Sequence, residues 1–159
     1  MANNDIKAIT FDLWNTLIAD TLHGGQARAS RRMKSTVDTL LSEGYSFDID
    51  QIRHAYSSSQ RIFEEIRTDG LDTDFQEQIS IFLSLIDDNM EKDLSVAARE
   101  RISTDHARTY LDDPPALMPG VPQVLEYLHK EGYKLGLICN SGATPGYIQR
   151  QFLKDKRIS

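Results

Sequence analysis

The chain has 159 residues, of which 40% are hydrophobic and 26% are charged, and its formal net charge is −6. This length suits one ordinary domain, or a small domain that carries an insertion. The negative charge argues against nucleic acid as a partner, because phosphate contacts need clustered Lys and Arg.

Targeting and membrane signals are not expected from this sequence. No apolar run approaches the roughly 20 residues that a membrane-spanning helix needs, and residues 1–7 are polar, without the apolar core of a signal peptide. The single cysteine, Cys139, excludes an internal disulfide and fits a reducing compartment. We therefore expect a cytoplasmic protein with no membrane partner.

The first predicted element is a strand over residues 6–13. Its nearly continuous apolar run is typical of a central strand that is covered on both faces. Asp12 interrupts this run and a polar turn follows at once. An Asp at the end of a buried strand can be a nucleophile, a metal ligand or both, or it can simply cap the turn.

Residues 21–111 have the pattern of four amphipathic helices. The expected helix boundaries come from Gly44, Asp48 or Asp50, Gly70, the capping-box form of residues 73–76, and Ser95. Apolar residues recur at helical spacing in each segment. The predicted inward faces are Met33, Val37, Leu40 and Leu41; Ile52, Tyr56, Phe63 and Ile66; Phe75, Ile79, Phe82, Ile86 and Met90; and Ala98, Ile102, His106 and Tyr110.

A second set of elements follows the helical segment. Pro114 and Pro115 predict an extended linker. Residues 121–131 then predict a helix with Val124, Leu125 and Leu128 on its apolar face, and residues 133–139 predict a second buried strand. A last helix after residues 144–146 carries Ile148, Phe152 and Leu153.

This order predicts an α/β fold: a partial doubly wound, Rossmann-like parallel sheet with an inserted α-helical bundle. The expected domains are residues 1–20 with 112–159 as the incomplete core, and residues 21–111 as the insertion. Parallel pairing of the two strands would place Asp12 beside residues 139–142 at one sheet edge. Hydroxyl, amide and N–H groups ahead of a helix would form an anion cradle there.

The run Phe11-Asp12-x-x-x-Thr16-Leu17 resembles the first motif of the haloacid dehalogenase-like (HAD) hydrolases. The resemblance implies that Asp12 is the nucleophile that forms an aspartyl ester and that Thr16 supports it. Phosphatases of the family usually have a second Asp where this chain has Trp14. An indole cannot transfer a proton, and the dehalogenase branch has a non-acid at this place because a halide leaves without protonation.

The second strand resembles the second HAD motif, an apolar strand that ends in Ser or Thr, often followed by Asn. The hydroxyl position falls on Cys139, with Asn140 next and Ser141 one residue later. The resemblance implies that these residues and Trp14 bind the substrate, although a small apolar strand end is the alternative for Cys139. Residues 119–121 also match, and the insertion matches a type-1 helical cap.

The resemblance further implies Mg²⁺ if the substrate is a phosphate ester, held by Asp12 and a backbone carbonyl such as that of Trp14.

The Lys of the third motif and the acids of the fourth are expected beyond Ser159, so we expect a truncated chain or one completed by a partner. Two hypotheses stand: a hydrolase acting on a small anionic substrate, either a phosphate ester or a 2-haloacid, and a non-catalytic remnant or binding protein. A homo-oligomer or a complementing chain would cover the open sheet edge.

The remaining candidate site residues are arginines and histidines scattered along the chain. Four arginines lie in the insertion, and one could hold a substrate carboxylate or phosphate, although a solvated helix face is the more frequent role. The histidines show no metal-ligand spacing and are expected on the surface or on helix faces. These residues are Arg28, Arg31, Arg32 and Arg53, and His23, His54, His106 and His129.

Overall fold

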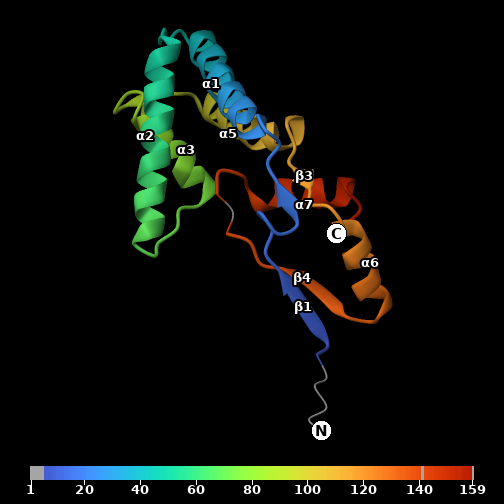
Figure 1. Ribbon diagram of the computed structural model, residues 1–159. Helices are drawn as coiled ribbons and strands as arrows, with labels where there is room; N and C mark the ends of the chain where they lie inside the picture. The colour runs from blue at the N-terminus through green and yellow to red at the C-terminus, as the bar shows by residue number, and fades with distance from the viewer. Residues whose placement is uncertain (1–5, 141, 159) are drawn as a thin grey trace.

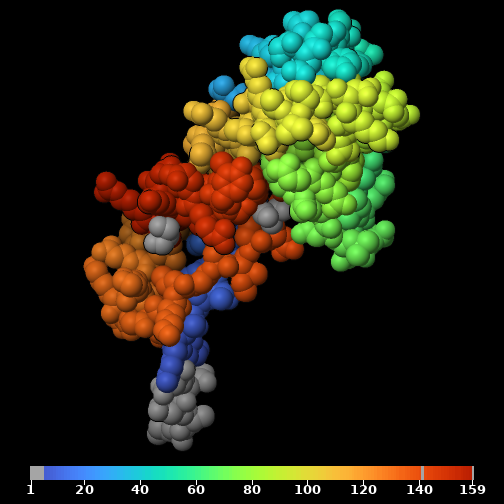
Figure 2. All heavy atoms as spheres, turned by 180° about the vertical axis from the view of Figure 1, so that it is seen from behind, coloured from blue at the N-terminus to red at the C-terminus, as the bar shows by residue number. Residues whose placement is uncertain are grey.

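The computed structural model describes residues 6–140 and 142–158. It is a mixed α/β structure in which a helical lobe, residues 24–112, lies at one end and the strands with the last two helices lie at the other (Figure 1). In the space-filling view, the red C-terminal residues lie directly against the helical lobe, and the orange and blue segments extend away from it (Figure 2). Within the described residues, no helix has the length and apolarity required to cross a membrane.

The predicted parallel pair of strands is confirmed. Strand β1 (Ala8–Phe11) pairs in parallel with β4 (Lys134–Leu137), in a register that sets Phe11 opposite Leu137. Helix α6 (Val121–Lys130) connects the linker to β4, and α7 (Gly146–Asp155) follows it. Gly120 has a φ of 82°, a left-handed conformation that favours glycine and allows the sharp entry into α6.

The expectation that both strands are buried on both faces is wrong. Every residue of β4 is exposed, and the residues of β1 alternate between exposed and half-buried. A strand is covered on both faces only when helices or other strands pack on each side, and in the described residues β4 pairs with β1 alone. Val124, predicted on the apolar face of α6, is also exposed.

A short antiparallel ribbon forms where the chain enters and leaves the helical lobe. Strand β2 (Ile18–Ala19) pairs with β3 (Ala116–Leu117). The sequence did not predict this ribbon, because two residues per strand are too few to show an alternating pattern. The ribbon ties together the two linkers that flank residues 24–112.

The helical lobe has the predicted long helices and one unexpected short one. Asp48 caps α2 with a complete capping box, and the Ser95 hydroxyl accepts a hydrogen bond from the Ala98 N–H at the start of α5. Asp74, rather than Thr73, caps the third helix. The helices are α1 (Gly24–Ser42), α2 (Ile49–Thr68), α3 (Phe75–Ser84), α4 (Met90–Asp93) and α5 (Val96–Asp112).

Two apolar clusters hold the molecule together. One lies inside the helical lobe, around Leu40, Ile52, Phe82 and Ile102. The other joins the lobe to the strand end and contains Leu13, Leu17, Ile18, Ala107, Tyr110, Val121, Ile148, Phe152 and Leu153. Leu41, predicted to face inward, is 64% exposed, because the neighbouring Leu40 occupies the inward face of α1 instead.

His106 is buried, in agreement with its predicted place on the inward face of the fourth helix. Its ring is 4% exposed, packs on Phe82, and shares a hydrogen bond of 2.9 Å between Nε2 and the Thr36 hydroxyl. Burial, and secondly the charge of Arg32, lower the pKa of His106 to about 3. The folded protein therefore holds His106 neutral.

The neutral His106 makes stability depend on pH. Its pKa is lower in the folded state than the ordinary 6.5, so the unfolded state binds more protons as pH falls from 6.5 toward 3. We expect the free energy of unfolding to fall by about 2 kcal/mol between pH 8 and pH 5 from this residue. Urea unfolding of wild type and His106→Gln checks this, since the variant should lack that part of the slope. His54→Gln, an exposed position on α2, should keep it.

Candidate active site

Asp12 lies directly after β1, at the edge where β1 and β4 both end. The Ile138 N–H donates to the Phe11 carbonyl oxygen at 2.9 Å, which continues the parallel pairing past the last residue of β4. Cys139 lies close enough for Asp12 to raise the pKa of its thiol. The structure therefore brings Asp12 and Cys139 together, as the parallel pairing predicted.

The turn after Asp12 is fixed by hydrogen bonds to a buried residue. The Leu13 carbonyl accepts from the N–H groups of Leu17 and Ile18 at 2.9 and 3.0 Å, and the Leu13 side chain is fully buried. Asn15 adopts a φ of 58°, a left-handed conformation that Asn tolerates better than most residues. This turn holds the Asp12 carboxylate exposed at the sheet edge.

Thr16 lies beside Asp12, in the turn that follows β1. Its hydroxyl donates to Asp12 Oδ2 at 3.4 Å. The bond is long and both side chains are exposed, so it orients the carboxylate more than it stabilises the fold.

Trp14 packs against the helical lobe. Its ring meets Tyr110 of α5 edge to face, with the centroids 6.1 Å apart, and it is half-buried against the cluster that joins the two parts. An indole N–H is a donor only and does not take part in acid–base exchange. The place two residues after Asp12 is thus filled by a packing residue.

Tyr110 is a buried residue whose hydroxyl has no hydrogen-bond partner among the described residues. Its side chain is fully buried between Trp14 and Phe152, and the Arg28 guanidinium lies over its ring at 5.9 Å. Burial raises the pKa of the Tyr110 hydroxyl, and Cys139 raises it further, whereas Arg28 opposes the shift. The phenol therefore stays protonated, and the sequence pattern alone predicted only that it faces inward.

Two of the predicted substrate-binding residues, Cys139 and Asn140, are described at the end of β4. Cys139 is half-buried, and burial, then Asp12, raise the pKa of its thiol, which keeps it a neutral and weak donor. Asn140 is exposed at the same edge. Ser141 lies outside the described residues. The described part of the predicted cradle thus consists of the Asn140 amide and the Cys139 thiol.

The described side chains do not by themselves fit a Mg²⁺ site. Within residues 6–140 and 142–158, no three His, Cys, Asp or Glu side chains gather closely enough to hold a metal ion. Asp12 supplies one carboxylate, and the carbonyl of Trp14 would add a single neutral oxygen. Mg²⁺ prefers octahedral oxygen coordination, usually with more than one carboxylate or with substrate phosphate.

Two arginines, the buried Arg28 and the exposed Arg31, join the two linkers beside this site; the expectation of a solvated arginine face is wrong for Arg28 and Arg32 only. Arg28 is 7% exposed; it forms two hydrogen bonds of 2.7 and 2.8 Å with the Asp20 carboxylate and one of 3.0 Å with the Asp113 carbonyl. Arg31 pairs with the Asp113 carboxylate. Asp20 precedes the helical lobe and Asp113 follows it, so these contacts fasten its entry to its exit. No local spacing in the sequence predicts these arginine contacts.

A family model described as haloacid dehalogenase-like hydrolase matches residues 6–153. The similar solved structures include a predicted phosphoglycolate phosphatase from Haemophilus somnus 129pt, at 16% identity and a TM-score of 0.45, and a hydrolase from Streptococcus pneumoniae TIGR4, at 17% identity and a TM-score of 0.35. The alignments cover 96% and 97% of this chain but only 58% and 62% of those chains. No curated protein sequence matches.

The unpartnered hydroxyl of Tyr110 predicts an unusual response to mutation. Tyr110→Phe keeps the ring and removes a buried group without a partner, so we expect a gain of about 1 kcal/mol in the free energy of unfolding. Tyr56→Phe is the matched control, because the Tyr56 hydroxyl accepts a hydrogen bond from Arg32 at 3.2 Å; it should cost about 1–2 kcal/mol. Chemical denaturation measures both, and a loss in Tyr110→Phe would contradict the prediction.

Proposed function

The chain belongs to the haloacid dehalogenase-like hydrolase family, and we propose that it uses Asp12 as a nucleophile on a small anionic substrate. The observation that carries this proposal is the position of Asp12 at the joint end of two parallel strands, with the Thr16 hydroxyl on its carboxylate and Cys139 beside it. Ligands of open α/β sheets bind at this edge. Thr16 orients the carboxylate, and Asn140 with the backbone after β4 contacts the anionic group of the substrate.

Two substrate classes fit this role, and Trp14 distinguishes them. With a 2-haloacid, an Asp12 oxygen forms a bond to the carbon that carries the halogen, and the halide leaves with the bonding electrons. Water then attacks the carbonyl carbon of the ester, which releases a 2-hydroxy acid and restores Asp12. With a phosphate ester, the leaving alkoxide needs a proton that Trp14 does not supply. We therefore favour carbon–halogen cleavage, with a phosphate ester as the second class.

The helical lobe is proposed to act as the cap over this site. Its entry and exit are fastened by the β2–β3 ribbon and by Arg28. A second contact is made by Arg32 of α1, which donates to the carbonyl oxygen of Ala143 in the segment after β4 at 3.1 Å. The lobe is thus joined both to its linkers and to the predicted substrate-binding segment. The proposed units remain residues 21–111 and residues 1–20 with 112–159.

Replacement of the nucleophile tests the activity. We expect Asp12→Asn to lower turnover by at least about a thousandfold, because an amide does not form the ester intermediate. The measurement is release of halide and of phosphate from short 2-haloacids and small phosphate monoesters. Asp38→Asn, an exposed position on α1, is the matched control and should be unaffected. Unchanged turnover in Asp12→Asn would overturn the assignment of Asp12.

The open sheet supports the alternative of a chain completed by a partner. Leu135, Leu137 and Ile138 are exposed, and a groove of about 950 Å³ separates the strands from α6 and α7. Further polypeptide from a second copy or a complementing chain would bury this apolar surface. Such a protein could bind a partner without catalysis.

Native mass spectrometry of the whole chain, measured across a dilution series, tests this alternative. We expect a dimer or a retained partner at high concentration, because an exposed apolar strand favours pairing. A monomer at every concentration would argue against a sheet completed by a second copy.

A further inference from the structure

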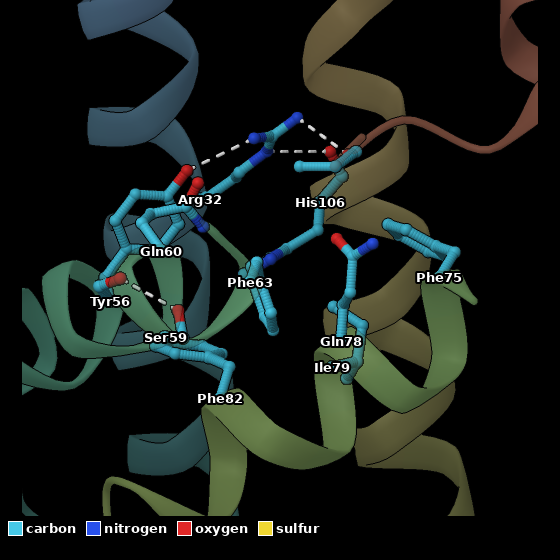
Figure 3. Close-up of a pocket in the computed structure, with 11 residues that line it drawn as sticks. Arg32, Tyr56, Ser59, Gln60, Phe63, Phe75, Gln78, Ile79, Phe82 and His106 are labelled. Atoms are coloured by element: carbon cyan, nitrogen blue, oxygen red, sulfur yellow. Dashed lines mark hydrogen bonds between the residues drawn. The ribbon is translucent and has the colours of Figure 1, made fainter. Parts of the chain in front are cut away.

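A small cavity lies between α1, α2, α3 and α5 of the helical lobe, and Ala143 of the segment after β4 completes its wall (Figure 3). Its volume is about 20 Å³, which exceeds the roughly 10–15 Å³ that one water molecule needs. Arg32, Tyr56, Gln60, Gln78 and His106 bring polar groups to its wall, and Phe63 and Phe82 are among its apolar neighbours. It is too small for a haloacid or a phosphate ester.

Arg32 carries a full positive charge into this wall while being only 6% exposed. Its Nε donates to the His106 carbonyl at 3.2 Å and to the Thr109 hydroxyl at 3.1 Å. One terminal nitrogen donates to the Tyr56 hydroxyl at 3.2 Å, and the other to the Ala143 carbonyl at 3.1 Å. Every one of these acceptors is neutral, and no carboxylate pairs with Arg32 among the described residues.

The hydrogen bonds also leave donors of Arg32 without an acceptor. A guanidinium has five N–H groups, and each terminal nitrogen of Arg32 uses one of its two in the described structure. The Tyr56 hydroxyl accepts from Arg32, so its own proton is available to a further acceptor. Two N–H groups of Arg32 and the Tyr56 O–H thus have no acceptor among the described hydrogen bonds at the wall of the cavity.

A buried charge without an opposite charge is unfavourable, and proteins normally pair it. His106 cannot provide that charge, because a histidine is either neutral or positive, and burial next to Arg32 keeps its pKa low. A cation in the cavity would be repelled. The group that fits is small, negatively charged and able to accept several hydrogen bonds.

We propose that this cavity binds one small monovalent anion of the halide class, such as chloride, between Arg32 and Tyr56. The bound anion offsets the Arg32 charge and accepts hydrogen bonds from the Arg32 N–H groups that have no acceptor in the protein. Because Arg32 also binds the Ala143 carbonyl, the anion stabilises the contact between the helical lobe and the segment after β4. This site involves neither Asp12 nor its turn, so it stands independently of the proposed activity.

Thermal unfolding of the full chain in sodium bromide tests the proposal against sodium gluconate at equal ionic strength. We expect a saturable rise in Tm with bromide only, since a ligand that binds the folded state alone stabilises it. Arg32→Met should abolish the rise, whereas Arg53→Met, an exposed arginine on α2, should retain it. A Tm that is equal in the two salts, or a bromide effect that survives in Arg32→Met, would overturn the proposal.

A milder variant and a direct measurement cover the case in which Arg32→Met does not fold. Tyr56→Phe should weaken the apparent bromide affinity about tenfold while the protein stays folded. Crystals grown in sodium bromide should show an anomalous bromine signal in the cavity next to Arg32. An ordered water there, without anomalous signal, would show that the cavity is merely hydrated and would overturn the assignment of an anion.

Discussion

The parallel pairing of β1 with β4 is the constraint on which the candidate site depends. Four residue pairs set the register, and the bond from Ile138 to Phe11 carries it one step further. That register alone brings Asp12 and Cys139, from opposite ends of the chain, to one edge. The turn built on the buried Leu13 then holds the carboxylate there. Without this pairing, Asp12 and Thr16 would lie in a loop, and the segment after β4 would not lie beside them.

Buried arginines are the second organising feature. Arg28 binds both linkers, and Arg32 binds α5, α2 and the segment after β4. Each guanidinium makes directional bonds to several elements at once, so it fixes an angle between them that apolar packing alone leaves loose. The position of the helical lobe over the strand end follows from these bonds as much as from the cluster around Tyr110.

The two parts of the molecule differ in how completely they are buried. The helical lobe closes an apolar cluster of its own, since its helices supply enough apolar surface to cover one another. The β1–β4 pair leaves one strand exposed along its length and borders a wide groove. A parallel sheet is stable when helices and strands cover both faces and edges. The candidate site around Asp12 therefore lies on a well-packed turn, beside a sheet whose faces and edge are largely exposed.

Local signals in the sequence determined the long helices, the caps of two of them and the place of Asp12 at the end of a strand. Asp48 and Ser95 act within one turn of their helices, and Asp12 is marked by the apolar run before it. The tertiary structure decided what depends on distant partners: the burial of Arg28 and Arg32, the packing of Trp14 on Tyr110, and the exposure of β4. Periodicity reports which residues share a face, but the burial of a charge is set by acceptors far away in the sequence, and only the folded chain brings these together.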